Sequence, residues 1–170
     1  MARQVFWTET RKLQFNFLRE MRLIVYEDTY QPVFRQLNLE WLDHYGLTEP
    51  YDLKILDDPR STVLDPGGFI WLVEAEGEIV GTAGLAKEAD GVFELIKMAV
   101  TESYQGRGIS RMLIEACLSQ ARAMGAKKVT LYSNHQLSRA IALYEKYGFR
   151  PVELGQSPMQ TADVRMELIL

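Results

Sequence analysis

The sequence has little cysteine, no long apolar run and no excess of basic residues, and each shortage excludes a class of protein. With one cysteine, Cys117, among 170 residues, the chain can form no intrachain disulfide, and the reducing cytoplasm is its expected location. Apolar runs are only a few residues long and residues 1–14 lack the apolar region of a secretory signal, so we expect no membrane span and no export. A formal net charge of -4 argues against nonspecific binding of nucleic acid, which needs basic side chains to neutralise phosphates.

Internal repeats, low-complexity tracts and interdomain linkers are also missing from the sequence. A chain of 170 residues can bury one sizeable core, and a content of 47% hydrophobic and 25% charged residues is typical of a folded globular protein. We therefore expect one domain over residues 21–170. Residues 1–20 carry both helical and strand spacings of apolar residues, and we interpret them as a short helical N-terminal extension.

The periodicity of the apolar residues predicts a mixture of strands and helices. Strands are expected over 21–27, 69–76, 78–88, 91–101, 127–133, 149–153 and 163–170, and helices over 28–44, 51–56, 109–124 and 136–147. Short links join the second, third and fourth strands, so these three form an antiparallel meander. The fold class is therefore α+β: a three-layer α/β/α arrangement, with a mostly antiparallel mixed sheet of about seven strands and helices on both faces.

The first predicted helix has recognisable ends and a regular apolar spacing. Asp28 or Thr29 is a candidate N-cap, and Gly46 is a natural stop. Its apolar residues recur every four positions, at Val33, Leu37, Trp41 and Tyr45. This stripe predicts the apolar face of the helix.

Two glycines lie in the segment QGRGIS, residues 105–110, between a predicted strand and a predicted helix. The first N–H groups of a helix lack intrahelical partners and glycines let the backbone approach a phosphate, so Gly106 and Gly108 favour an anion cradle, to which Arg107 adds charge. The alternative is a plain turn between the strand and the helix. The third glycine of a dinucleotide motif is absent and no GK[ST] follows, which excludes nicotinamide dinucleotides and P-loop triphosphates.

Three segments follow one another in the chain: ELIKMAV (Glu94–Val100), QGRGIS (Gln105–Ser110) and AIALYEKYGF (Ala140–Phe149). In this order and spacing they resemble the central strand, the pyrophosphate loop and the second motif of the GNAT superfamily of acyl-CoA-dependent N-acyltransferases. The likeness covers about residues 21–170. It implies the GNAT-like acyl-CoA N-acyltransferase fold and acetyl-CoA (coenzyme A) as the acyl donor.

The resemblance also implies which residues hold the cofactor. The backbone of Met98 and Val100 would pair with the pantetheine arm, where the strands of Met98 and Leu131 splay apart. The pyrophosphate would lie on the loop, whose members are Gln105, Gly106, Arg107, Gly108, Ile109 and Ser110. Ser110 stands where the family usually has glycine or alanine, and its small hydroxyl side chain should preserve binding. Leu137 stands where an asparagine is common, and Asn134, one turn earlier, either caps the helix or contacts the cofactor.

Three residues are candidates for the chemistry of acyl transfer, which needs a base, a donor to the oxyanion and an acid for the thiolate. Tyr144 occupies the position of the family's thiol-protonating tyrosine; the alternative is an aromatic residue of the core. Glu94 starts the central strand where some members of the family carry a catalytic glutamate, so the resemblance makes it the candidate general base, directly or through water; a glutamate that simply faces solvent is the alternative. The resemblance also implies that the Met98 N–H would polarise the thioester carbonyl.

The remaining candidates favour structural interpretations. Cys117 lies on the apolar face of the long helix and is expected in the core. His44 and His135 show no metal-ligand spacing, so no metal site is assigned. Glu49 and Asp52 could line the acceptor side and attract an ammonium, but a solvated loop is the favoured interpretation.

The function predicted from these residues is N-acetyl transfer from acetyl-CoA to a primary amine, directly within a ternary complex. The alternative is a non-catalytic acyl-CoA-binding or assembly module, and a third interpretation is a purely structural α+β domain. The acceptor, a small-molecule amine or a peptide, is not identified by the sequence, because the acceptor face is built from variable segments. Members of the family are often dimers, so the resemblance leaves a homodimer open.

Overall fold

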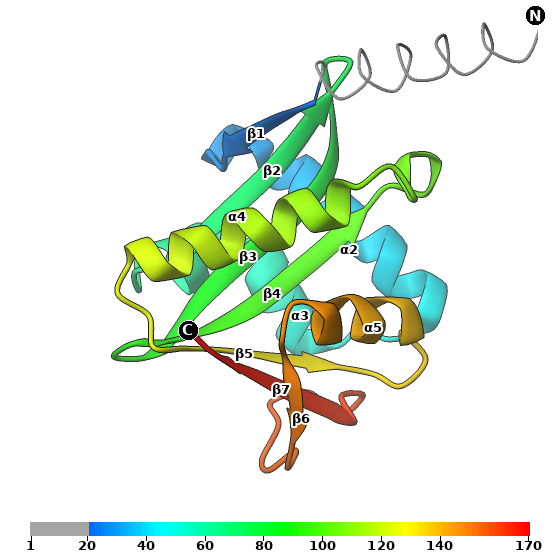
Figure 1. Cartoon of the computed structure of the whole chain (residues 1–170). Coiled ribbons are helices and arrows are strands. Elements are labelled where there is room, and N and C mark those ends of the chain that lie inside the picture. The colour runs from blue at the N-terminus through cyan, green and yellow to red at the C-terminus, as the bar shows by residue number, and fades with distance from the viewer. Residues whose placement is uncertain (1–20) are drawn as a thin grey trace, which may run out of the picture.

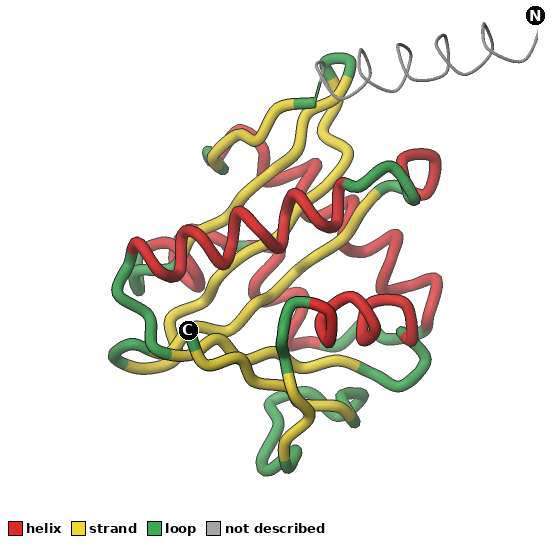
Figure 2. The backbone as a smooth tube through the Cα atoms, viewed as in Figure 1, coloured by secondary structure: helices red, strands yellow, loops and turns green. Residues whose placement is uncertain are grey.

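A seven-stranded sheet forms the centre of the protein in the computed structural model, which describes residues 21–170 (Figures 1 and 2). The strands are β1 (Arg22–Val25), β2 (Phe69–Ala75), β3 (Glu78–Ala89), β4 (Val92–Val100), β5 (Lys128–Ser133), β6 (Arg150–Val152) and β7 (Val164–Ile169). The helices are α2 (Gln31–Tyr45), α3 (Pro50–Asp57), α4 (Ile109–Ala123) and α5 (Ser138–Lys146), with short helical turns η1 (Asp28–Tyr30), η2 (Arg60–Leu64) and η3 (Glu102–Tyr104). The predicted fold class and order of elements are confirmed, whereas the predicted extension over 1–20 lies outside the described residues.

The sheet is antiparallel except at one pair of strands. Its order is β1-β2-β3-β4-β5-β7-β6, and only β4 and β5 run parallel within it. The meander of β2, β3 and β4 is confirmed. The insertion of β7 between β5 and β6 places the last strand of the chain inside the sheet, beside β5.

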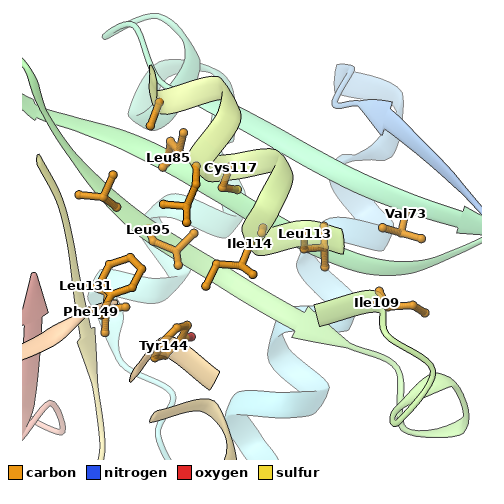
Figure 3. Close-up of a cluster of buried hydrophobic side chains, with 14 of the residues drawn as sticks. Val73, Leu85, Leu95, Ile109, Leu113, Ile114, Cys117, Leu131, Tyr144 and Phe149 are labelled. Carbon is orange, nitrogen blue, oxygen red and sulfur yellow. The ribbon is translucent and has the colours of Figure 1, made fainter. Parts of the chain in front are cut away.

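Helices cover both faces of this sheet. In Figure 1, α4 and α5 lie over the near face, and α2 and α3 lie behind it. Beneath α4, side chains that recur at helical spacing, among them Leu113, Ile114 and Cys117, pack against Leu85 and Leu95 of the sheet (Figure 3). Cys117 is fully buried there, so its prediction as a core residue is confirmed. No helix of residues 21–170 is both long enough and apolar enough to cross a bilayer.

The other face has its own core, and α2 meets it differently from the prediction. The buried residues of α2 are Phe34, Leu37 and Asn38, whereas Tyr45 is 37% exposed, so the predicted stripe is wrong at Tyr45. A helix has 3.6 residues per turn, so a strict spacing of four drifts away from the sheet. Neither predicted N-cap begins α2: Tyr30 does, without a side-chain hydrogen bond. The predicted stop at Gly46 is confirmed.

Candidate active site

A cleft opens where the two parallel strands part. The pairing of β4 with β5 ends at Glu94 opposite Thr130, and beyond it the strands diverge, as Figure 1 shows toward the right. The cleft has a volume of about 510 Å³. Of the predicted site residues, those that line it are Glu94, Met98, Val100, Gln105, Gly106, Ser110, Asn134 and Tyr144, whereas Arg107, Gly108 and Ile109 do not.

A β-bulge in β4 shapes the middle of the cleft. Thr82 pairs with Ala99 and Gly84 with Ile96, so one residue of β3 lies opposite two residues of β4, Lys97 and Met98. Lys97 has a φ of 51°, in the left-handed region that is strained for a residue with a side chain. The bulge turns the backbone around Met98 out of the regular ladder and toward the cleft.

The glycine loop closes one end of the cleft and leads into α4. Gly106 and Gly108 have φ values of 75° and 87°, and a Cβ at either position would meet nothing within 4 Å. Among residues 21–170 no group accepts a hydrogen bond from the backbone N–H of Gly106, Ile109 or Ser110. Because these donors point outward from the start of a helix, the loop fits a phosphate or pyrophosphate group.

The side chains of Gln105, Arg107 and Ile109 in this loop each contact other parts of the protein. The Arg107 guanidinium lies over the ring of Tyr104, 4.7 Å from its centroid, and the side chain of Ile109 is buried in the core, so only its backbone can face a ligand. The Gln105 amide donates a hydrogen bond of 3.2 Å to the carbonyl oxygen of Val100. That carbonyl therefore already has one donor, which a pairing with pantetheine would have to share or replace.

Tyr144 belongs both to the core and to the cleft. It lies on α5, is 8% exposed and packs edge-on against Phe149 with a centroid distance of 5.9 Å (Figure 3). Burial raises the pKa of its hydroxyl, and the nearby Cys117 raises it further. The hydroxyl therefore stays protonated at neutral pH and can serve as a proton donor.

Glu94 is buried rather than exposed to solvent, so the alternative of a solvent-facing glutamate is wrong. It is 6% exposed, and no group of residues 21–170 donates a hydrogen bond to its carboxylate. Burial, and secondly the negative charge of Glu88, raise the pKa of Glu94 to about 7, while Lys97 and Arg165 lower it. A carboxyl group with a pKa near 7 is suited to general-base catalysis at neutral pH.

One side of the cleft is lined by residues of α3, where the sequence interpretation favoured a solvated loop. Glu49 and Asp52 form a capping box at its start, and the prediction of a solvated loop is wrong for Asp52, which lies in the helix and is buried. Asp52 is 2% exposed and pairs with Lys97. Glu49 accepts hydrogen bonds from the Gln160 N–H (2.7 Å) and the Thr161 hydroxyl (3.0 Å), which joins α3 to the loop before β7.

Lys97 and Tyr51 also line the cleft, and the sequence interpretation did not name them as candidates. Lys97 is the single basic residue in the apolar strand ELIKMAV, and this placement is a signal that could have drawn attention to it. Tyr51 faces the cleft from α3, and burial and the charge of Glu94 raise its pKa to about 12. For Tyr51 no comparable signal exists in the sequence.

Asn134 holds loops together and does not cap α5. The N-cap of α5 is Leu137, without a side-chain hydrogen bond. The Asn134 amide donates to the carbonyl oxygen of Thr161 at 2.6 Å, and its oxygen accepts from the Gln136 N–H at 3.0 Å. The next residue, His135, pairs with Asp163, and no group of three or more metal-ligating side chains occurs among residues 21–170.

Comparisons with known proteins agree with this architecture. The Acetyltransferase (GNAT) family pattern matches residues 26–149. An uncharacterized N-acetyltransferase from Escherichia coli strain K12 is 36% identical over 144 residues, which cover 79% of this chain and 83% of the relative.

Two solved structures share the fold. A GNAT-family acetyltransferase from Staphylococcus aureus Mu50 superposes with a TM-score of 0.81 at 20% identity, over 88% of this chain and 98% of the other. A GNAT-family acetyltransferase from Elizabethkingia anophelis with acetyl-CoA bound superposes with a TM-score of 0.60 at 21% identity, over 89% and 99% of the two chains. These structures confirm the predicted fold.

Proposed function

The chain belongs to the GNAT acetyltransferase family, and we propose that it transfers the acetyl group of acetyl-CoA directly to a primary amine held in the acceptor half of the cleft. One observation carries this proposal: a buried carboxyl group with a pKa near 7, Glu94, and a buried hydroxyl, Tyr144, line the same cleft. A base and an acid are the two groups that acyl transfer from a thioester to an amine requires.

The residues around the glycine loop suit the cofactor. Acetyl-CoA, when bound, supplies an acetyl group activated as a thioester. The backbone N–H groups of Gly106, Gly108, Ile109 and Ser110 would hold its pyrophosphate, with Gln105 and Arg107 beside them. Met98 and Val100 would offer their backbone to the pantetheine arm, and Asn134 also lines the cleft. The Elizabethkingia neighbour, which has acetyl-CoA bound, supports this assignment at the level of the fold.

In the proposed reaction, Glu94 and Tyr144 each transfer one proton, and Met98 stabilises the charge that develops on the carbonyl oxygen. The Glu94 carboxylate accepts the proton that the amine loses as the new C–N bond forms, directly or through a water. The Met98 N–H donates a hydrogen bond to the carbonyl oxygen, where negative charge develops. The Tyr144 hydroxyl gives its proton to the sulfur as the C–S bond breaks.

The acceptor is an amine on a small molecule or a peptide. A non-catalytic binding module is the weaker alternative, because it gives no reason to bury Glu94. Burying a carboxyl group that has no hydrogen-bond donor costs stability, and a protein that only binds the cofactor gains nothing from it.

The proposal is tested by Tyr144→Phe, with Tyr147→Phe as the matched control. Turnover is followed as release of the coenzyme A thiol with a panel of primary amines. Removing the Tyr144 hydroxyl should lower kcat by about 100-fold or more and leave the acetyl-CoA affinity unchanged, because the acid acts after binding.

Tyr147 stands three residues later, at the end of α5, and its hydroxyl donates to Glu115 at the surface. Its replacement by phenylalanine should leave kcat unchanged. If Tyr144→Phe retains the kcat of the wild type, Tyr144 is not the acid.

A further inference from the structure

A buried ion pair joins the bulge of β4 to α3. The Lys97 ammonium pairs with the Asp52 carboxylate, and the two side chains are 8% and 4% exposed. Replacing a buried ion pair with apolar side chains is often neutral or stabilising, because removing both charges from water costs more than their attraction returns. Stability therefore does not explain why this pair lies beside the cleft.

The position of Lys97 in the bulge offers an explanation. Its carbonyl oxygen accepts a hydrogen bond from the Thr82 hydroxyl at 2.8 Å, and that hydroxyl accepts one from the Asn38 amide at 3.1 Å. Its ammonium is held by Asp52 from the other side. The strained backbone of Lys97 is thus fixed through its carbonyl by Thr82 of β3, which Asn38 of α2 holds, and through its side chain by Asp52 of α3.

The same pair extends to the acceptor loop. Asp52 also accepts the Glu49 N–H at 3.0 Å, and the Glu49 carboxylate holds Gln160 and Thr161. A continuous set of contacts therefore runs from the residue before Met98, through the first turn of α3, to the loop that lines the acceptor half of the cleft.

We propose that Lys97, through its ion pair with Asp52, is a positioning residue that fixes the Met98 N–H relative to the acceptor wall of the cleft. This inference rests on the proposed function, because it concerns the oxyanion donor of acetyl transfer. The strand is a feature of the family, whereas the ion pair is a contact between these two side chains of this protein.

The charge of Lys97 also affects the ionisation of Glu94, which a purely structural contact would not do. The titratable groups that interact with Glu94 are Glu88 of β3, Lys97 of β4, Arg165 of β7 and Tyr51 of α3. Tyr132 of β5 and Asp52 of α3 line the same cleft. Within this set Lys97 lowers the pKa of Glu94, opposing the effect of burial. Loss of the Lys97 charge should therefore move the ionisation of Glu94 to higher pH.

The test is the double variant Lys97→Met/Asp52→Asn. Methionine keeps most of the length of the lysine side chain without its charge, and asparagine keeps a carbonyl oxygen for the Glu49 N–H, so neither partner of the pair is left as an unpaired buried charge. The matched control is Arg22→Met/Glu74→Gln, which removes a surface ion pair of 2.7 Å between β1 and β2, far from the cleft. The measurements are kcat against pH, and titration of the Glu94 carboxyl carbon by ¹³C NMR in the protein without substrates.

We expect the double variant to lose about 10- to 100-fold in kcat, because small displacements of a catalytic donor are costly, while acetyl-CoA affinity is unchanged. The Glu94 carboxyl should titrate at higher pH than in the wild type, and the acidic limb of the kcat profile should move with it. The single variant Asp52→Asn keeps the Lys97 charge and should leave the Glu94 titration at or below its original pH. The control should match the wild type in both measurements.

Wild-type kcat in the folded double variant, or an unchanged Glu94 titration, overturns the proposal and leaves the pair a structural contact. A wild type that acetylates no amine refutes the proposed function instead. The NMR titration needs no acceptor, so it decides the role of the Lys97 charge even in that case.

Discussion

The burial of Glu94 links its ionisation to folding, and this link gives a test of the active site that needs no acceptor. The pKa of Glu94 rises from 4.5 to about 7 on folding, so the folded protein resists ionisation where the unfolded chain does not. Below pH 4.5 the group is protonated in both states and costs nothing. Between the two pKa values the free energy of unfolding should fall by about 1.4 kcal/mol per pH unit, to a total loss of about 3 kcal/mol that stays constant at higher pH.

The variant Glu94→Gln removes this dependence, because glutamine resembles the protonated side chain at every pH. Relative to the wild type, the variant should gain about 3 kcal/mol in unfolding free energy between about pH 4 and about pH 8. Denaturant unfolding at the two pH values measures the change. Glu153→Gln is the matched control, because Glu153 is exposed, and its offset from the wild type should be the same at both pH values.

The same pKa should govern catalysis. At about pH 6 only about a tenth of Glu94 is ionised, so kcat/KM of the wild type should fall about tenfold per pH unit below pH 7.

A stability difference between the wild type and Glu94→Gln that does not change with pH would show that Glu94 ionises as it does in water. The assignment of Glu94 as a buried base would then be wrong.

Two further predictions concern the cofactor loop and the thiol. Gly108→Ala should cost about 1 kcal/mol of stability, because alanine is strained at a φ of 87°, and should weaken acetyl-CoA binding in calorimetry. Gly125→Ala, with a φ of 75° at the other end of α4, should cost similar stability and leave the affinity unchanged; equal affinities for all three proteins would contradict the cradle. Burial raises the pKa of Cys117 to about 12, so a disulfide reagent should modify it only after unfolding in guanidinium, and rapid modification of the native protein would contradict its burial.

Local patterns predicted most elements of the fold because each pattern is a property of a short segment. Glycine stops such as Gly46 and Gly125 and the change of period near Ile109 fix where α2 and α4 end or begin. The bulge at Lys97 and the place of β7 beside β5 depend on contacts between distant segments, which one sequence does not reveal. The π-helical turn Arg60–Leu64 was not predicted either.

The candidate site also has features that a local sequence predicts and features that depend on distant contacts. The glycine loop could be predicted because its chemistry comes from its own backbone conformation. The burial of Glu94 could not be predicted, because it requires α3 to lie against the part of β4 that carries Glu94. The residues of α3 lie about forty positions earlier in the chain. Asp52 was misread as solvated for the same reason, since its partner Lys97 is distant in sequence.

The two proposed catalytic groups lie on opposite faces of the sheet, and this arrangement bears on how the donor and the acceptor would meet. Tyr144 packs in the layer of α4 and α5, whereas Glu94 points toward α3. A continuous sheet would separate them, but both line one cleft because β4 and β5 part beyond Glu94. The donor and acceptor can therefore approach the opening from different sides and meet within it, which favours direct transfer. A covalent acyl-enzyme on cysteine would need a thiol at that opening, and Cys117, the one thiol of the chain, is buried beneath α4 and does not line the cleft.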